Sequence, residues 1–156
     1  MDRILQRLKY GGALAFAAWA AQALAADVAA RVPAAGRPDV LVPLPLTPAR
    51  QRARGFNQAQ EIARETAAGL GIGVERLLAR VRDGSPQAAL PWSGRAANVR
   101  GAFACSGDVT GRHVALVDDV MTTGATAGEA ARTLIAGGAA RVSVWVIART
   151  LPPGDA

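Results

Sequence analysis

The chain has 156 residues, which is the length of a single domain with one core. Its net charge of +6 comes almost entirely from arginine, because Lys9 is the only lysine. Arginine suits anionic ligands, but coding bias explains the same composition equally well, so charge alone selects no partner. Cys105 and His113 are the only residues of their types, which excludes an internal disulfide and a zinc site of cysteine and histidine.

The first 25 residues allow two interpretations. Residues 1–10 are basic, residues 11–25 are apolar, and Ala23-Leu24-Ala25 resembles a signal cleavage site, as in a secreted binding protein. The alternative is a buried first helix over roughly 12–32, with Phe16 and Trp19 packed inside. The apolar run is too short for a membrane span, which needs roughly 20 apolar residues.

A turn with proline and glycine follows at 33–38, and residues 39–42 have the apolar pattern of a short buried strand. Three prolines in the next twelve positions predict that residues 44–55 form a loop without helix or regular strand. This loop carries three arginines that are candidates for binding an anion: Arg50, Arg52 and Arg54.

A helix is predicted after Asn57, which is a plausible N-cap with Gln60 three residues on. Its buried face contains Ile62, Thr66 and Leu70, and the glycines at 69–73 end it. A second strand is predicted at 77–81. Residues 82–100 show no sustained periodicity and predict a long exposed loop, which is typical of a functional lid or a disordered segment.

The last third predicts a strand at 113–118, a helix at 126–136 and a strand at 141–148. The first of these strands is apolar without alternation, as expected for a central parallel strand that is covered on both faces. This βαβ unit predicts an α/β fold, with a mostly parallel sheet and helices on both faces.

Asp118 and Asp119 fall at the carboxyl end of that central strand, where ligands bind in open parallel sheets. Small and hydroxylated residues then lead into the next helix and predict an anion nest for a phosphate monoester: Met121, Thr122, Thr123, Gly124, Ala125 and Thr126. No lysine follows the glycine, which argues against a nucleoside triphosphate. Because carboxylates accept hydrogen bonds from hydroxyl groups, the pattern predicts a ribose 5-phosphate ligand.

Residues 114–126, VALVDDVMTTGAT, resemble the signature of the type I phosphoribosyltransferases, which bind 5-phosphoribosyl-1-pyrophosphate (PRPP). LKYGG at 8–12, RGFNQAQEIA at 54–63 and GRAANVRGAF at 94–103 resemble the ComF-like competence proteins, a branch of that superfamily. This resemblance implies that residues 1–35 are a helix of the folded domain, in the position of a small or reduced hood. It therefore favours a cytoplasmic protein over a cleaved signal.

The resemblance also implies roles for individual residues. Asp118 and Asp119 would bind the ribose hydroxyls with help from Mg²⁺, residues 122–126 would hold the 5-phosphate, and the loop arginines would face the departing pyrophosphate. Arg95 and Arg100 lie in segment 82–100, which matches the superfamily's flexible lid. The implied activity is glycosyl transfer of a 5-phosphoribosyl group with release of pyrophosphate, and it requires no side-chain nucleophile.

Two departures leave alternatives open. Many ComF-like proteins carry a cysteine-rich zinc segment ahead of LKY that has no counterpart here, so we expect no zinc, and the chain is either a short natural form or one whose start was assigned late. The small hood leaves the acceptor undefined. A non-catalytic module in DNA uptake, acting through a nucleotide, DNA or a DNA-processing protein partner, therefore remains an alternative, and a homodimer is left open.

Overall fold

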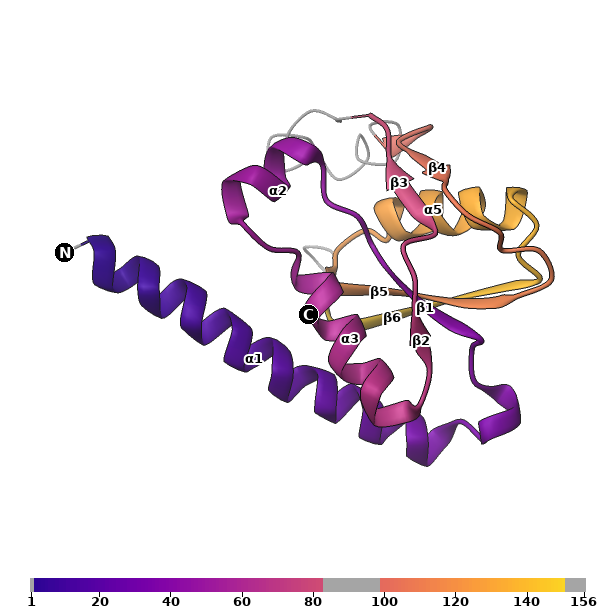
Figure 1. Cartoon of the computed structure of the whole chain (residues 1–156), viewed down its shortest axis with the longest axis horizontal. Coiled ribbons are helices and arrows are strands. Elements are labelled where there is room, and N and C mark those ends of the chain that lie inside the picture. The colour runs from indigo at the N-terminus through magenta and orange to yellow at the C-terminus, as the bar shows by residue number, and fades with distance from the viewer. Residues whose placement is uncertain (1, 83–98, 151–156) are drawn as a thin grey trace.

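The computed structural model describes residues 2–82 and 99–150, with the side chains of residues 17–53, 55–82 and 99–150. The elements in chain order are α1 (Asp2–Arg31), the 3-10 helix η1 (Ala34–Gly36), β1 (Val40–Pro43), α2 (Pro48–Arg54), α3 (Gln58–Leu70), β2 (Gly73–Val74), β3 (Leu78–Arg80), β4 (Phe103–Cys105), β5 (His113–Met121), α5 (Ala125–Ala136) and β6 (Arg141–Arg149) (Figure 1).

The main sheet has the strand order β2-β1-β5-β6, and its three pairings are all parallel. Leu41 of β1 is in register with Ala115 of β5, and Val117 of β5 is in register with Trp145 of β6. β3 and β4 form a separate antiparallel pair. The expected α/β fold with a mostly parallel sheet is therefore confirmed.

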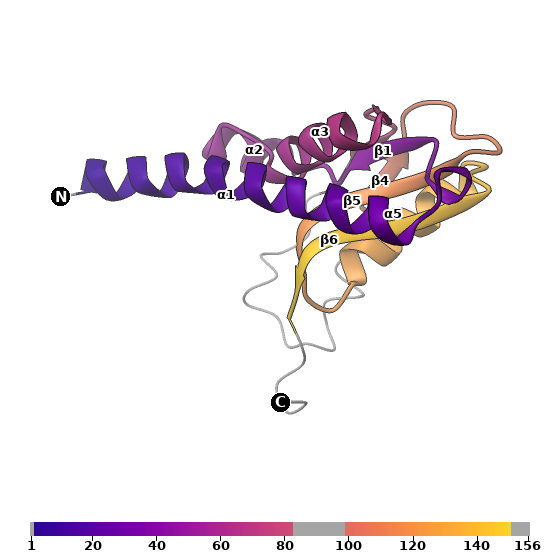
Figure 2. The same cartoon turned by 90° about the horizontal axis from the view of Figure 1, so that it is seen from below.

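Both faces of this sheet are covered, which explains the apolar sequences of its central strands. Side chains on one face of β1 and β5, including Val42 and Leu116, pack against Leu134 of α5. The alternate residues, including Leu41 and Ala115, pack against α1 and α3. Figure 2 shows α1 and α3 on one side of the sheet and α5 on the other. A strand covered in this way has no room for unpaired polar side chains along its length.

The connections out of β1 and β5 run in opposite directions. From β1 the chain passes through α3 to β2 on one side, and from β5 it passes through α5 to β6 on the other. β1 and β5 are neighbours in the sheet. The two loops that follow them therefore diverge and leave a crevice at their carboxyl ends, which is where ligands bind in open α/β sheets.

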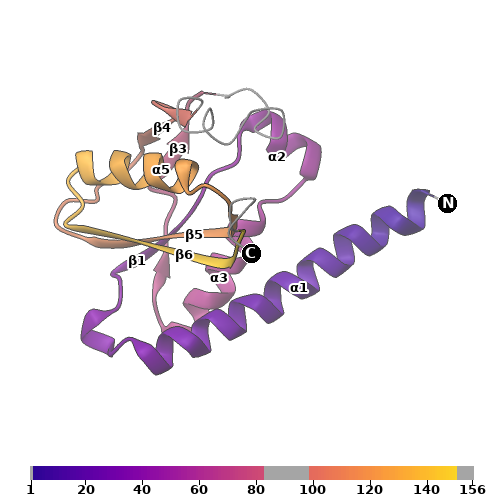
Figure 3. The same ribbon diagram turned by 180° about the vertical axis from the view of Figure 1, so that it is seen from behind.

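α1 packs on α3 through small side chains. Ala21 is fully buried, the hydroxyl of Thr66 donates to the carbonyl of Ala21 at 3.3 Å, and a Cβ added at Gly69 would lie 3.0 Å from Cβ of Ala25. The predicted helix is confirmed but begins at Asp2 instead of residue 12. The amino-terminal half of α1 extends beyond the sheet (Figure 3). Trp19 was expected in the core but is 64% exposed.

The prediction that residues 44–55 form a loop is wrong in part, because α2 occupies residues 48–54. Pro48 is the first residue of this helix, where a missing N–H removes no helical hydrogen bond, and Thr47 caps it by accepting the Arg50 amide at 3.2 Å. Proline therefore starts this helix instead of preventing it.

Two short strands were missed by the sequence patterns. β2 contains Gly73, which had been assigned to the end of the preceding helix, and β4 lies in the stretch around Cys105. Both are two or three residues long, too short for a two-residue alternation to be recognised. Among the described residues, no helix is long and apolar enough to cross a membrane.

The close packing of α1 on α3 predicts that Ala21→Leu lowers the free energy of unfolding by about 1–3 kcal/mol, because the larger side chain has no space between the helices. Chemical denaturation with circular dichroism measures this change. Ala23→Leu is the matched control, since Ala23 lies two residues on and is exposed. Equal stability of the two variants would contradict the assigned interface.

Candidate functional site

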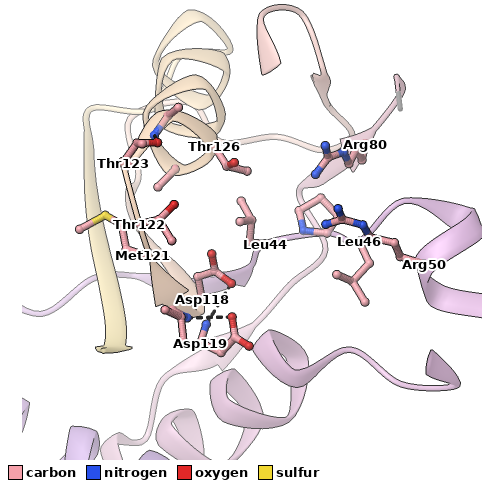
Figure 4. A pocket seen from close by; sticks show the side chains of 15 residues that line it. Leu44, Leu46, Arg50, Arg80, Asp118, Asp119, Met121, Thr122, Thr123 and Thr126 are labelled. Atoms are coloured by element: carbon pink, nitrogen blue, oxygen red, sulfur yellow. Dashed lines mark hydrogen bonds between the residues drawn. The ribbon is translucent and has the colours of Figure 1, made fainter. Parts of the chain in front are cut away.

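A pocket of about 220 Å³ opens at the carboxyl ends of β1 and β5. Residues 44–46, which follow β1, form part of its lining, and residues 118–127 connect the end of β5 with the start of α5 along another part. Arg50 of α2 and Arg80 of β3 complete it (Figure 4). The pocket therefore lies at the crevice that the strand order creates.

Asp118 and Asp119 are the first polar residues beyond the buried part of β5, and both line the pocket. Asp118 accepts the amide of Asp119 at 2.9 Å, and Asp119 accepts the amide of Val120 at 2.8 Å. Burial, followed by repulsion from the neighbouring Asp119 carboxylate, raises the pKa of Asp118 from 3.8 to about 7. A half-buried acid with such a pKa is characteristic of functional sites.

The segment between β5 and α5 has the geometry expected for an anion nest. Gly124 has a φ of +75°, a left-handed conformation that other residues adopt only with strain, and it leads directly into α5. The hydroxyl of Thr123 accepts the amide of Ala125 at 3.2 Å. The candidate phosphate-binding residues 121–126 all line the pocket. They lie at the positive end of the helix dipole, which favours an anion.

The candidate arginines are distributed differently from the sequence prediction. Arg50 lines the pocket, whereas Arg52 and Arg100 are exposed and are not among its lining residues. The side chain of Arg54 and all of Arg95 lie outside the described residues, as does most of segment 82–100, including Gln87 and Asn98. Of the predicted arginines within the described part of the chain, the pocket thus brings in Arg50 alone.

Arg80 lines the pocket, although the sequence patterns assigned it no role. Figure 4 shows Arg50 and Arg80 across the pocket from the threonines of the 121–126 segment. Arg80 belongs to β3, which is outside the main sheet, so its position depends on how the β3–β4 pair packs. No local pattern in the sequence indicates that packing.

Asn57 has a second role besides the predicted cap of α3. Its side-chain oxygen accepts the amide of Ala59 at 3.1 Å, and its side-chain nitrogen donates to the carbonyl of Leu44 at 3.1 Å. Leu44 lines the pocket, and its amide donates to the carbonyl of Val117 at 2.9 Å. The buried Asn57 thus fixes the loop after β1. The side-chain oxygen of Gln60, three residues after the cap, accepts from Nε of Arg76 at 3.1 Å.

The donor atoms of the pocket suit a magnesium ion that is shared with a ligand. Within residues 2–82 and 99–150 no group of three or more His, Cys, Asp or Glu side chains could hold a metal. Mg²⁺ is commonly bound by only one or two carboxylates, with water and ligand phosphates completing its coordination. The Asp118 and Asp119 carboxylates fit that mode of binding.

Curated proteins with related sequences are competence and DNA-utilization proteins. The chain is 40% identical to the DNA utilization protein YhgH of Salmonella typhi over 115 residues, 73% of this chain and 51% of that protein. It is 33% identical to Competence protein F of Haemophilus influenzae over 153 residues, 96% of this chain and 61% of that protein. The chain thus spans between half and two-thirds of the length of these relatives.

Solved structures with a similar fold are phosphoribosyltransferases. The glutamine PRPP amidotransferase of B. subtilis, complexed with ADP and GMP, has a TM-score of 0.54 at 25% identity, over 82% of this chain and 26% of that chain. The purine phosphoribosyltransferase of Pyrococcus horikoshii has a TM-score of 0.52 at 20% identity, over 85% of this chain and 72% of that chain. No family model matches the chain.

The sequence relatives and the structural neighbours agree with the signature at residues 114–126, of which residues 118–126 line the crevice at the carboxyl ends of β1 and β5. The chain thus has the type I phosphoribosyltransferase fold and is similar in sequence to the ComF-like competence and DNA-utilization proteins.

Proposed function

We propose that this protein binds PRPP together with Mg²⁺ and transfers the 5-phosphoribosyl group to an acceptor with release of pyrophosphate. The observation that carries the proposal is the composition of the pocket. Two carboxylates, a helix-terminal nest and two guanidinium groups line one crevice at the switch point of the sheet. A ribose with a phosphate at one end and a diphosphate at the other presents a complementary group to each of them.

In this proposal residues 122–126 hold the 5-phosphate, and Asp118 and Asp119 accept hydrogen bonds from the ribose hydroxyls. Arg50 faces the diphosphate across the pocket. The bond between ribose C1 and the diphosphate oxygen breaks, a bond from C1 to the acceptor forms, and the diphosphate leaves with both bonding electrons. The carboxylates stabilise the positive charge that develops on the ribose ring.

Mg²⁺, when bound with the ligand, would neutralise part of the diphosphate charge. The residues that would hold it are Asp118 and Asp119, because they are the carboxylates that line the pocket. Both hydrogen-bond the backbone of the following residue, which orients their remaining oxygen atoms. The same two carboxylates would thus bind both the magnesium ion and the ribose hydroxyls.

The energetic cost of Asp118 supports a role in binding. A carboxyl group whose pKa is raised to about 7 by burial and by a neighbouring acid weakens the folded state whenever it is ionised. The hydrogen bond that the Asp118 side chain accepts from the Asp119 amide could equally be accepted by the oxygen of an asparagine, so it does not require an acid. Residues that cost stability without contributing to the fold are expected at functional sites.

A second candidate is a non-catalytic module in DNA uptake that binds a nucleotide, DNA or a DNA-processing protein. The names of its relatives, DNA utilization protein and competence protein, favour this candidate. Few aromatic residues are available for base stacking, with aromatics at 4% of the chain, which argues against extended contacts with single-stranded DNA. A DNA affinity that falls steeply with salt, without pyrophosphate release, would favour this candidate over transfer.

The first prediction concerns ligand binding. Calorimetric titration of PRPP is expected to show binding that depends on Mg²⁺, and Asp118→Asn combined with Asp119→Asn is expected to weaken it at least about 100-fold, because several hydrogen bonds to charged groups are lost. Asp108→Asn is the control, since Asp108 is an exposed acid that does not line the pocket. Undiminished PRPP affinity in the double variant would exclude the assigned ribose site.

The second prediction concerns stability and pH. The folded-state pKa of Asp118, about 7, lies above its ordinary value of 3.8, so the folded state binds a proton that the unfolded state has released. Stability from this group is therefore present at low pH and is lost as the pH rises from about 4 through 7. The side chain of Asp118→Asn stays neutral at every pH. The free energy of unfolding of this variant is therefore expected to exceed that of the wild type by about 1–2 kcal/mol at pH 8, with a smaller difference at pH 5.

Thermal unfolding at both pH values checks this second prediction. Asp119→Asn provides the comparison, because it also removes the repulsion between the two carboxylates but leaves Asp118 titratable. An Asp118→Asn variant that is less stable than the wild type at pH 8 would show that the ionised acid contributes to the fold.

A further inference from the structure

The β3–β4 pair contributes a guanidinium group to the lining of the pocket and restrains it there. Arg80, at the end of β3, is half-buried, and its Cζ lies 5.5 Å from the centre of the Phe103 ring of β4. Its Nε donates to the carbonyl of Arg82 at 3.4 Å. A cation above an aromatic ring is attracted to the ring face, so this contact restricts where the guanidinium group can lie.

The Phe103 ring is itself fixed. It is 6% exposed and belongs to the core cluster that also contains Leu116 of β5 and Leu134 of α5. Leu78, at the start of β3, belongs to the same cluster. Both strands of the small pair are thus anchored in the main core, although they form no hydrogen-bonded ladder with the main sheet.

A carboxylate on α5 fixes the chain just before β4. Glu129 accepts the amide of Gly101 at 2.7 Å and pairs with Arg132 at 2.7 and 2.9 Å. Hydrogen bonds from Arg132 and from the Gly101 amide lower the pKa of Glu129 to about 2, so it remains ionised at neutral pH. α5 also begins at the 121–126 nest. One helix therefore supports both the nest and the strand pair that carries Arg80.

We propose that Arg80 binds the diphosphate of the ligand, opposite the nest that takes its 5-phosphate, and that Phe103 and Glu129 are positioning residues for this contact. The inference rests on the proposed function and adds to it a binding residue from outside the main sheet. It also explains why an arginine is half-buried beside the pocket, since its charge there is complementary to a ligand with an anionic group at each end.

The test compares two ligands that differ only in the diphosphate, PRPP and ribose 5-phosphate, each titrated with Mg²⁺. Arg80→Met keeps an unbranched side chain that can pack on Phe103 but removes the charge. It is expected to weaken PRPP binding about 10–100-fold and to leave ribose 5-phosphate binding unchanged. Arg76→Met is the control, because Arg76 is exposed, pairs with Gln60 and does not line the pocket.

The outcomes separate this inference from the proposed function. A loss confined to PRPP supports it. An equal loss for both ligands, or no loss for either, would overturn the role of Arg80 while the proposed function stands. Wild-type protein that binds neither ligand would overturn the proposed function and this inference with it. Thermal unfolding of each variant confirms that the compared proteins are folded.

A double-mutant cycle tests the positioning role of Glu129. Glu129→Ala removes the acceptor for the Gly101 amide, whereas Glu129→Gln keeps an oxygen there. The alanine variant alone is therefore expected to lose affinity for PRPP while it keeps its affinity for ribose 5-phosphate. If Glu129 acts through Arg80, Glu129→Ala has no further effect on PRPP affinity in the Arg80→Met background. Additive losses of PRPP affinity in the double variant would show that Glu129 has a purely structural role. The same conclusion would follow if Glu129→Gln failed to preserve the binding of either ligand.

Discussion

The burial of β5 on both faces is the constraint on which the rest of the structure depends. Residues 114–117 are completely inaccessible to solvent, with β1 and β6 on either side and helices above and below. Such a strand excludes unpaired polar groups along its length, so polar chemistry can begin only where the cover ends. The cover ends at Val117, the last residue paired with β1, and the next residue is Asp118. The position of the acids is thus a direct consequence of how the core is built.

The site combines elements that are held in place in different ways. The nest and the acids follow from one continuous segment between β5 and α5, whose geometry is local. The opposite wall comes from α2 and β3, which are held by caps and by packing of side chains in the core. Asn57 and Glu129 connect these separate parts through single hydrogen bonds to backbone groups of Leu44 and Gly101. Polar residues outside the pocket lining therefore help to hold the segments that form it.

The small side chains of the protein have a structural purpose. Alanine at 17, 21 and 25 allows α1 to approach α3 closely, and Gly69 lies at the same interface. A core of this kind gains little from any single large side chain and relies on close contact over a long interface. This packing makes residues 17–31 of α1 part of the domain, because their inward side chains cover the sheet on the side of α3.

The sequence by itself determined the fold class, the central strand, the helices after Asn57 and Gly124, and the acids and nest of the candidate site. These features are local: an apolar run, a cap or a glycine at a left-handed position encodes each of them within a few residues. The helix that begins at Pro48 is also local, since Thr47 caps it, although the prolines around it predicted a loop. Only the tertiary structure decided that Trp19 faces solvent, that Arg80 enters the pocket and that Arg52 and Arg100 do not. Each of these depends on contacts between residues far apart in the chain, such as Phe103 with Arg80 and Glu129 with Gly101, and no local pattern encodes such contacts.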